Sequence, residues 1–240
     1  MNRDTLFRAK GTGDQPFAFN TEVVQVFHDM INRSVPYYRQ VLSLSAEIAH
    51  ELYQSDSVIY DFGSSTGALA TVLQQEFKNT HFQYIGIDNS NAMIQACQKN
   101  ASFSQDKRLQ FQFGDITNIS LLNTSSCVMN YTLQFIERQK RIEFLKNIYR
   151  ALLPRGCLII SEKCLENDSD ISNLFINRHH ALKERHGYSK LEIAEKRNAL
   201  ENVLIPLTLT ENLGLLRAAG FEKISVLFKV LNFVTLIALK

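Results

Sequence analysis

The spacing of hydrophobic residues changes character near residue 57 of the chain. Before that point, apolar residues recur three and four positions apart, which predicts one helix around residues 23–31 and a second from residue 36 to about 52. Residues up to about Phe19 show no such period and contain glycines and a proline, so we expect them to form an irregular lead-in arm.

Beyond residue 57, short β-rich runs alternate with amphipathic stretches. We expect strands at residues 58–60, 82–87, 109–113, 127–131 and 157–160, and helices at residues 66–77, 92–100 and 137–153. This alternation predicts a mostly parallel sheet covered by helices on both faces. Pro154, Arg155 and Gly156 are expected to close the last of these helices and turn the chain into the next strand.

The last third of the chain departs from this alternation. Residues 168–204 predict two polar helices, interrupted at Gly187 and Tyr188, with no strand between them. They cannot extend the sheet, so we expect a lid or an oligomer contact over its edge. A helix at residues 209–219 then precedes two strands, 224–230 and 233–239, which are close enough in sequence to pair antiparallel.

We therefore interpret the 240 residues as one domain built on a seven-stranded α/β sheet. Its parts are an N-terminal arm with helices (residues 1–56), a ligand-binding core (57–163), a helical insert (164–206) and a C-terminal helix with its strand pair (207–240).

Composition and charge exclude several classes of function. Hydrophobic residues make up 45% of the chain, enough for a sizeable core. No apolar run approaches the roughly 20 residues needed to cross a bilayer, and the polar start lacks a secretion signal, so we expect a cytoplasmic protein without membrane contact. The 26 basic and 24 acidic side chains are mixed along the helices, which argues against direct binding of nucleic acid.

Neither the cysteines nor the histidines indicate a metal site. The four cysteines show no paired or zinc-ligand spacing, and we expect all of them to be reduced and structural. His179 and His180 are adjacent on a predicted helix, where side chains point about 100° apart and chelate one metal poorly. No Ser-His-Asp or Cys-His grouping is recognisable, so the sequence identifies no catalytic residue.

The segment DFGSSTG, residues 61–67, lies where the first parallel strand meets its helix. In open parallel sheets, ligands bind beyond the carboxyl ends of the strands. Gly63 lets the backbone approach a ligand closely, Ser64 and Ser65 keep the turn open, and Gly67 allows tight strand–helix contact. A dinucleotide site needs G-x-G-x-x-G, whereas this loop is G-x-x-x-G, which suits an uncharged ribose carrying an amino-acid tail. A tight turn without a ligand is the alternative.

Polar residues also follow the next three strands. Asp88 can accept both hydroxyls of a ribose, although it could instead cap the following helix, a role that Ser90 can fill. Asp115 can accept from an adenine amino group while Ile116 borders the ring, and Asn130 lies at the mouth of the same cleft. Together with the glycine loop, these strand ends predict a site for S-adenosylmethionine or a close relative of it.

Two further segments refine this prediction. Asn130 is followed by Tyr-Thr-Leu, not by the Pro-Pro-Tyr that amino-methylating nucleic-acid enzymes use to hold a flipped base. Arg197, in the segment EKRN, lies either on a solvated helix face or folded over the pocket. A guanidinium near the sulfonium cation costs Coulomb energy unless an anion lies between them. A pocket arginine would therefore indicate a carboxylate on the ligand or substrate, held bidentately.

These residues lie within a wider resemblance. Over almost its full length the chain resembles the carboxy-S-adenosyl-L-methionine synthase family, which has the class I methyltransferase fold. The matching segments are RDTLF at 3–7, RSVP at 33–36, IDNS at 87–90, GDI at 114–116, TLQF at 132–135, SEK at 161–163, and GYS, LEI, KR and LENV within 187–203. Ordinary methyltransferases share the glycine loop and the ribose acid, but not the arm or the insert.

The resemblance implies a specific reaction between S-adenosylmethionine and prephenate. Prephenate loses its ring carboxylate as carbon dioxide, and the methyl carbon, deprotonated to a sulfonium ylide, traps it, giving carboxy-S-adenosylmethionine and phenylpyruvate. The resemblance also implies a homodimer, no metal, and a product that passes to a separate enzyme building the oxyacetic acid group on wobble uridine in transfer RNA.

Matching the family's motifs residue by residue gives ten expected binding residues: Tyr38, Gly63, Ser64, Ser65, Asp88, Asn89, Asp115, Ile116, Asn130 and Arg197. Arg197 would hold the new carboxylate, while Ser64 stands where the family usually has cysteine. Two alternatives remain open: an ordinary methyltransferase of a small molecule or RNA, and a non-catalytic protein that binds the nucleoside.

Overall fold

A single mixed sheet organises the part of the chain that the computed structural model describes, residues 2–78 and 80–240. In these residues seven strands follow the order β3-β2-β1-β4-β5-β7-β6. The strands are β1 (Val58–Phe62), β2 (Gln83–Asp88), β3 (Leu109–Phe113), β4 (Thr124–Asn130), β5 (Leu152–Lys163), β6 (Lys223–Val230) and β7 (Phe233–Leu239). Pairing is parallel from β3 to β5, and β7 is antiparallel to both β5 and β6. This confirms the predicted sheet.

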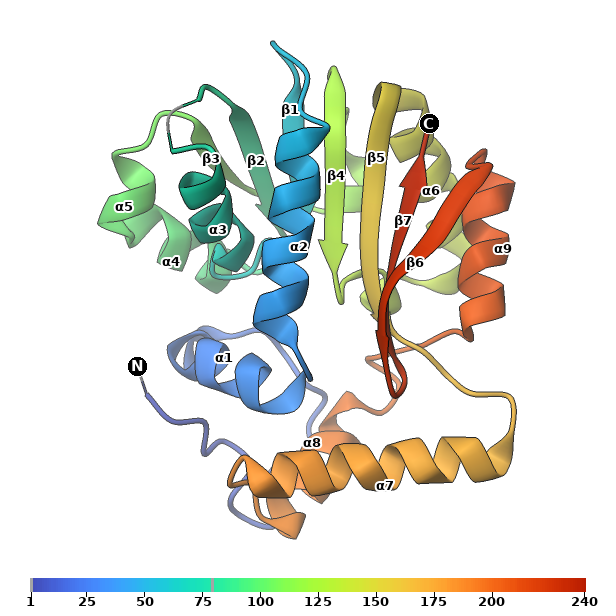
Figure 1. Cartoon of the computed structure of the whole chain (residues 1–240). Helices are drawn as coiled ribbons and strands as arrows, with labels where there is room; N and C mark the ends of the chain where they lie inside the picture. Colours follow the sequence, from blue (N-terminus) through green and yellow to red (C-terminus); the bar gives the residue numbers. More distant parts are fainter. Residues whose placement is uncertain (1, 79) are drawn as a thin grey trace.

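Helices lie on both faces of the sheet and beyond one of its ends (Figure 1). The described helices are α1 (Thr21–Ser34), α2 (Tyr38–Glu51), α3 (Ala68–Glu76), α4 (Asn91–Lys99), α5 (Ala101–Ser104), α6 (Arg138–Ala151), α7 (Ser169–Arg185), α8 (Lys190–Leu200) and α9 (Leu209–Ala219), with short 3-10 turns η1 (Ile116–Asn118) and η2 (Leu133–Phe135). None of them is long and apolar enough to cross a membrane.

The core consists of two apolar layers separated by the sheet. Every residue of β1 is buried, and successive side chains of a strand point to opposite faces. Accordingly, Tyr60 and Phe62 pack with residues of α6 and α9, whereas Ile59 packs with residues of α2 and α3. A strand covered on both faces needs this continuous apolar sequence, which is why the run VIYDF indicates a central strand.

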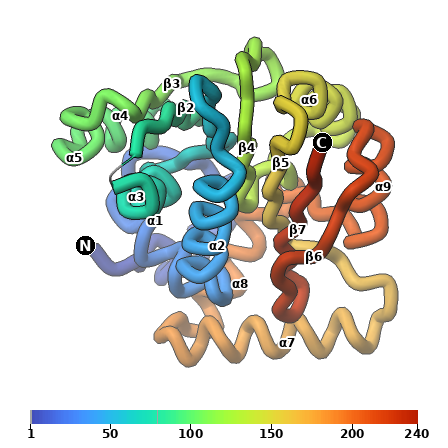
Figure 2. The backbone as a smooth tube through the Cα atoms, turned by 45° about the horizontal axis from the view of Figure 1, so that its top comes forward, coloured from blue at the N-terminus to red at the C-terminus, as the bar shows by residue number. Residues whose placement is uncertain are grey.

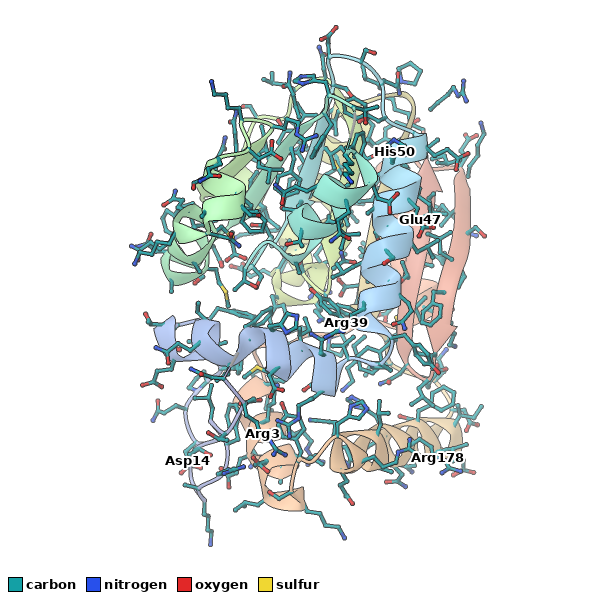
Figure 3. All side chains as sticks on the ribbon, turned by 60° about the vertical axis from the view of Figure 1, so that its left-hand side comes forward. Arg3, Asp14, Arg39, Glu47, His50 and Arg178 are labelled. Atoms are coloured by element: carbon teal, nitrogen blue, oxygen red, sulfur yellow. The ribbon has the colours of Figure 1, made fainter. Side chains whose placement is uncertain are left out.

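The parallel strands all end toward α1, α7 and α8, which lie across the carboxyl edge of the sheet (Figures 1 and 2). The N-terminal arm holds these helices together. The Tyr188 hydroxyl donates to the buried Asp4 carboxylate at 2.5 Å, and the Arg33 guanidinium carbon lies 3.8 Å from the centroid of the Tyr188 ring. Arg3 donates to the Gly187 carbonyl at 3.2 Å, on the side of the insert that faces the arm (Figure 3). The insert is thus anchored to the arm and to α1.

Most elements differ from their predicted bounds by a few residues, and two differences are larger. The helix expected to reach residue 153 ends at Ala151, and β5 begins directly after it. Arg155 has φ 66°, and the pairing of β4 with β5 shifts register between Leu152 and Cys157. The Pro-Arg-Gly segment therefore forms an irregularity inside the strand and not a turn before it. The other difference is α5, a single turn capped by Asn100, which has no apolar period to predict it.

Replacing Tyr188 by phenylalanine tests the anchoring of the insert. The substitution removes the donor to Asp4, which is only 1% exposed, so we expect unfolding to become easier by about 1–3 kcal/mol in urea titrations. Tyr37→Phe is the matched control, because Tyr37 is 56% exposed, and its effect should stay within about 0.5 kcal/mol. Equal effects of the two substitutions would contradict the account.

Candidate functional site

A cavity of about 690 Å³ opens beyond the carboxyl ends of the parallel strands. All ten residues expected from the sequence to bind the ligand line its wall. They come from β2 and β4, from the loops after strands, from η1, and from α2 and α8, so the fold brings together residues more than 150 positions apart in the chain. α7 and α8 also line the cavity, as a lid would.

The glycine loop after β1 is held in a conformation that exposes its backbone. Gly63 has φ 76°, and a Cβ atom at this position would collide with the side chain of Thr132. The amide nitrogens of Gly63 and Ser64 donate to the Ile87 carbonyl at 2.8 and 3.0 Å. Ser65 has φ 51° and donates its amide to Asp88 at 2.9 Å. Only glycine fits at position 63, both for its positive φ and for the space available.

Asp88 ties this loop to the start of α4. Its two carboxylate oxygens accept from the amides of Ser65 and Ser90, at 2.9 and 2.8 Å. Burial raises the pKa of Asp88, while the two backbone hydrogen bonds oppose that rise. Ser90 caps α4 through its side chain, which accepts from Met93, so the capping alternative for Asp88 is wrong. Each oxygen of Asp88 retains the capacity to accept a further hydrogen bond from a ligand.

Two buried polar atoms of the wall lack a hydrogen-bond partner among the described residues. They are Nδ2 of Asn130, whose Oδ1 accepts from Ser161 at 2.9 Å, and Oγ of Ser64. An unsatisfied buried donor costs free energy that a bound polar ligand can recover. Asp115, exposed at the rim, accepts from the amide and hydroxyl of Thr117 at 2.9 and 2.8 Å. These atoms suit a nucleoside with hydroxyl and amino groups.

Asp61 also lines the cavity, and its role was missed from the sequence. It is 3% exposed and accepts from the Tyr84 hydroxyl at 2.7 Å. Burial raises the pKa of Asp61 to about 7, against the Tyr84 hydrogen bond, which lowers it. Asp61 is the one acid in an otherwise apolar strand, and this exception in the sequence could have identified it as a site residue. Burial raises the pKa of the Tyr38 and Tyr131 hydroxyls, which therefore stay protonated.

The arm closes another side of the cavity. Phe17 and Phe19 line it, and the Ser90 hydroxyl donates to the Phe19 carbonyl at 2.5 Å. The Phe19 ring meets Phe135 edge-to-face with centroids 5.5 Å apart. Phe17 donates its amide to the Ala199 carbonyl of α8 at 2.8 Å. Apolar residues do not recur at regular intervals in this segment, so its contribution to the cavity wall was not predicted.

Basic side chains gather on the wall formed by β5, α7 and α8. Lys163 ends β5, Lys183 belongs to α7, and Lys196 and Arg197 belong to α8. Among the described residues, none of the four has a carboxylate within ion-pairing distance. Lys183 and Lys196 are 7% and 8% exposed, whereas Arg197 is exposed to solvent at the cavity wall.

Burial leaves these lysines with lowered pKa values. Desolvation, then the positive charge of Lys163, lowers the pKa of Lys183 to about 8. Desolvation, then Lys183, lowers the pKa of Lys196 to about 7. The neighbouring His179 donates or accepts at the Ser34 carbonyl at 2.7 Å, and burial lowers its pKa to about 3, so it is neutral. This wall therefore gathers basic side chains that form no ion pair with the described residues.

The alternative that residues 195–198 form a solvated helix face is wrong for half of them. Glu195 and Lys196 are buried, and Glu195 accepts from the Gly13 amide of the arm at 2.7 Å. Arg197 lines the cavity, as the pocket interpretation requires. Lys163 ends a buried strand, so the rule that predicted Asp88 could also have predicted it. No sequence pattern pointed to the lysines of the insert.

The acid at the end of β2 and the basic wall formed by β5, α7 and α8 lie on different sides of the cavity. Asp88 ends β2 and Lys163 ends β5, and the sheet order places β1 and β4 between these two strands. Three interstrand steps separate their backbones by roughly 14 Å. The cavity therefore has a negative end, suited to a nucleoside with a positive sulfonium, and a positive end, suited to an anion.

Comparison with known proteins assigns the family. A relative from Desulfotalea psychrophila, named carboxy-S-adenosyl-L-methionine synthase, is 38% identical over 239 residues, covering 99% of this chain and 97% of its own. A protein of the same name from Erwinia tasmaniensis is 38% identical over 240 residues, covering 100% and 98%. The chain belongs to the carboxy-S-adenosyl-L-methionine synthase family. It is therefore an enzyme of the transferase class.

The core of this carboxy-S-adenosyl-L-methionine synthase family member has the methyltransferase fold. Residues 59–156 match the family described as "Methyltransferase domain". Human N-acetylserotonin methyltransferase, solved in complex with SAM, superposes with a TM-score of 0.62 at 18% identity, covering 98% of this chain and 57% of the larger protein. The plantazolicin methyltransferase BpumL has a TM-score of 0.62 at 15% identity, covering 91% and 89%. These structures confirm the predicted fold class.

The described residues contain no group of three or more His, Cys, Asp or Glu side chains that could hold a metal ion. The four cysteines are buried and unpaired in disulfides, as the sequence predicts. S-adenosylmethionine, which the family name implies, fits the residues present: the unpartnered Asn130 and Ser64 atoms, the open backbone at Gly63 and the acid at the end of β2.

The buried cation at Lys196 has a measurable consequence for stability. Burial, and then the charges of Lys183 and Arg33, lower the pKa of Lys196 below the ordinary 10.5, and the charge of Asp4 opposes this shift. The unfolded chain then binds more protons, so this residue destabilises the fold below about pH 7, and the cost disappears as the pH rises toward 10.5.

Lys196→Met should therefore raise the free energy of unfolding by about 1–3 kcal/mol near pH 6, and the gain should shrink toward pH 10. The difference between variant and parent is the quantity to measure, because other buried groups titrate in both proteins. Lys190→Met, at an exposed position on the same helix, is the control. A difference that does not change with pH would contradict the lowered pKa.

Proposed function

We propose that this enzyme transfers a carboxyl group from prephenate to S-adenosylmethionine, giving carboxy-S-adenosylmethionine, phenylpyruvate and water. The support comes from the names of its relatives and from one feature of the cavity: an unpaired basic wall that includes Arg197 stands opposite a nucleoside-binding end. Placing cations near a sulfonium in one cavity is unfavourable unless an anion lies between them. A carboxylated ligand supplies that anion.

The residues of the cavity have complementary roles in this proposal. Asp88 accepts hydrogen bonds from the ribose hydroxyls, and Asp115 with Ile116 borders the adenine. Arg197 holds the carboxylate that appears on the former methyl carbon, through a charge-assisted pair of hydrogen bonds. Asn130 offers its unpartnered Nδ2 to the ligand. The chain itself shows no group that must serve as the proton acceptor.

The product is an activated carboxymethyl donor, so a separate carboxymethyl-transferring enzyme must consume it. We assign that step to the building of the oxyacetic acid group on wobble uridine in transfer RNA, with both enzymes in the cytoplasm. The net charge of +2 is small, which argues against direct binding of the RNA by this chain. A homodimer is supported by exposed apolar residues on the insert, such as Ile171 and Leu174, which are 45% and 54% exposed.

Incubating the purified enzyme with S-adenosylmethionine and prephenate tests the proposal. We expect phenylpyruvate and carboxy-S-adenosylmethionine in equal amounts by mass spectrometry. Reactions without S-adenosylmethionine correct for spontaneous breakdown of prephenate. Phenylpyruvate at the background level would contradict the proposal and favour a binding protein. Formation of S-adenosylhomocysteine with a methylated acceptor would favour an ordinary methyltransferase.

Arg197→Ala tests the role of the guanidinium. We expect the affinity for carboxy-S-adenosylmethionine to fall about 10- to 100-fold, since hydrogen bonds to charged groups contribute about 1.5–3 kcal/mol. Plain S-adenosylmethionine should bind as well as before or better, because a like charge near its sulfonium is removed. Arg178→Ala is the control: Arg178 is exposed and lies on the insert away from the sheet (Figure 3). Equal loss for both ligands in calorimetry would refute this role.

A further inference from the structure

Two buried lysines of the insert form no ion pair with a carboxylate among the described residues. Lys183 and Lys196 flank one aromatic ring: their Nζ atoms lie 5.8 and 6.0 Å from the centroid of Tyr188. Lys196 donates to the Ser34 hydroxyl at 3.3 Å, and within the described residues neither lysine makes an ion pair. Both side chains line the cavity. A buried, unpaired pair of like charges is costly, so a structural role alone does not explain it.

The charged groups around the pair compensate it only in part. Asp4 is the nearby acid, and its carboxylate accepts from the Tyr188 hydroxyl at 2.5 Å and from the Leu6 amide at 3.2 Å. Its charge raises the pKa of both lysines, but burial and the neighbouring cations keep both pKa values below the ordinary one. Arg33 adds positive charge, and it is paired with Asp29 at 2.9 Å. Lys163 adds a further cation from the end of β5, while His179 on α7 is neutral. The site is thus preorganised for an anion that enters with the substrate.

We propose that Lys183 and Lys196 bind the carboxylate of the 2-oxo acid side chain of prephenate; this inference rests on the proposed function. Of the two carboxylates of prephenate, one is lost as neutral carbon dioxide and the other stays charged in phenylpyruvate. A strong ion pair with the departing carboxylate would stabilise the charge that the reaction must remove, and so would slow its loss. A pair with the retained carboxylate carries no such penalty, because its charge is the same in substrate, transition state and product.

The position of the pair fits this assignment. Besides burial, the charge of Arg197 lowers the pKa of Lys163, and the charge of Lys163 lowers the pKa of Lys183, so these side chains lie near one another. The basic wall therefore continues from Arg197, where the transferred carboxyl group ends, through Lys163 to the lysine pair. In prephenate the ring carboxylate and the 2-oxo acid side chain stand on the same ring carbon, so with the side-chain carboxylate at Lys183 and Lys196 the departing carboxylate is directed toward the nucleoside end of the cavity.

Steady-state kinetics of Lys183→Met and Lys196→Met test the inference. We expect each substitution to raise the KM for prephenate about 10- to 100-fold, with a much smaller change in kcat, because the interaction is equal in ground and transition states. The Ki of phenylpyruvate as an inhibitor against prephenate should rise by a similar factor, since it retains the same carboxylate. The Kd of S-adenosylmethionine should change less than about twofold. Lys190→Met, on the exposed face of α8, should leave all four constants unchanged.

The outcomes separate the possible occupants of the pair. An unchanged KM for prephenate in both variants would overturn the inference. Weakened binding of S-adenosylmethionine with an unchanged Ki for phenylpyruvate would overturn it too, and would assign the lysines to the methionine carboxylate. If a methionine variant fails to fold by thermal denaturation, Lys183→Gln and Lys196→Gln provide neutral side chains that retain hydrogen bonding.

The inference and the proposed function can fail independently. A wild-type enzyme that converts no prephenate overturns the proposed function. In that case calorimetry with phenylpyruvate still decides the lysine site: binding that the wild type shows and both variants lose supports it, and absence of binding by the wild type overturns it.

Discussion

A cation buried beside another cation must either lose its proton or have an anion beside it, and the cavity of this enzyme depends on that constraint. Its basic wall consists of Lys163, Lys183, Lys196 and Arg197, none of which forms an ion pair within the chain's described ranges. The family's ligand carries a sulfonium, which adds one more positive charge. In the proposed function, a substrate with two carboxylates and a product with one new carboxylate relieve the repulsion that an ordinary methyl donor would leave in place.

Two parts of the fold place acidic and basic side chains on different sides of the cavity. The parallel strands carry acids at their ends, with Asp88 fixed by the amides of Ser65 and Ser90. The cations come mostly from the insert, and the arm fixes the insert through Asp4 and Tyr188. In the proposed function the strand ends bind the nucleoside, and the insert with the end of β5 binds the anion. This division explains how one common fold can support a reaction other than methyl transfer.

The sequence predicted the features that follow from local pattern and failed where burial depends on distant segments. Alternating strands and helices gave the sheet, and the strand-end rule placed Asp88, Asp115 and Asn130 on one cavity. Lys196 looked like part of a solvated helix because α8 is polar on most sides. Its burial comes from α1, 162 residues earlier, and from the arm, 182 residues earlier, and the arm has no periodic signal. The strand β5 was shortened in the prediction because a proline and a glycine sit within its irregular start.

The mass of the nucleoside that the enzyme retains through purification tests the central claim most directly. Preference for an anionic ligand at the basic wall predicts a molecule heavier than S-adenosylmethionine by one carbon dioxide. Recovery of S-adenosylmethionine or S-adenosylhomocysteine alone, from cells that make prephenate, would contradict it.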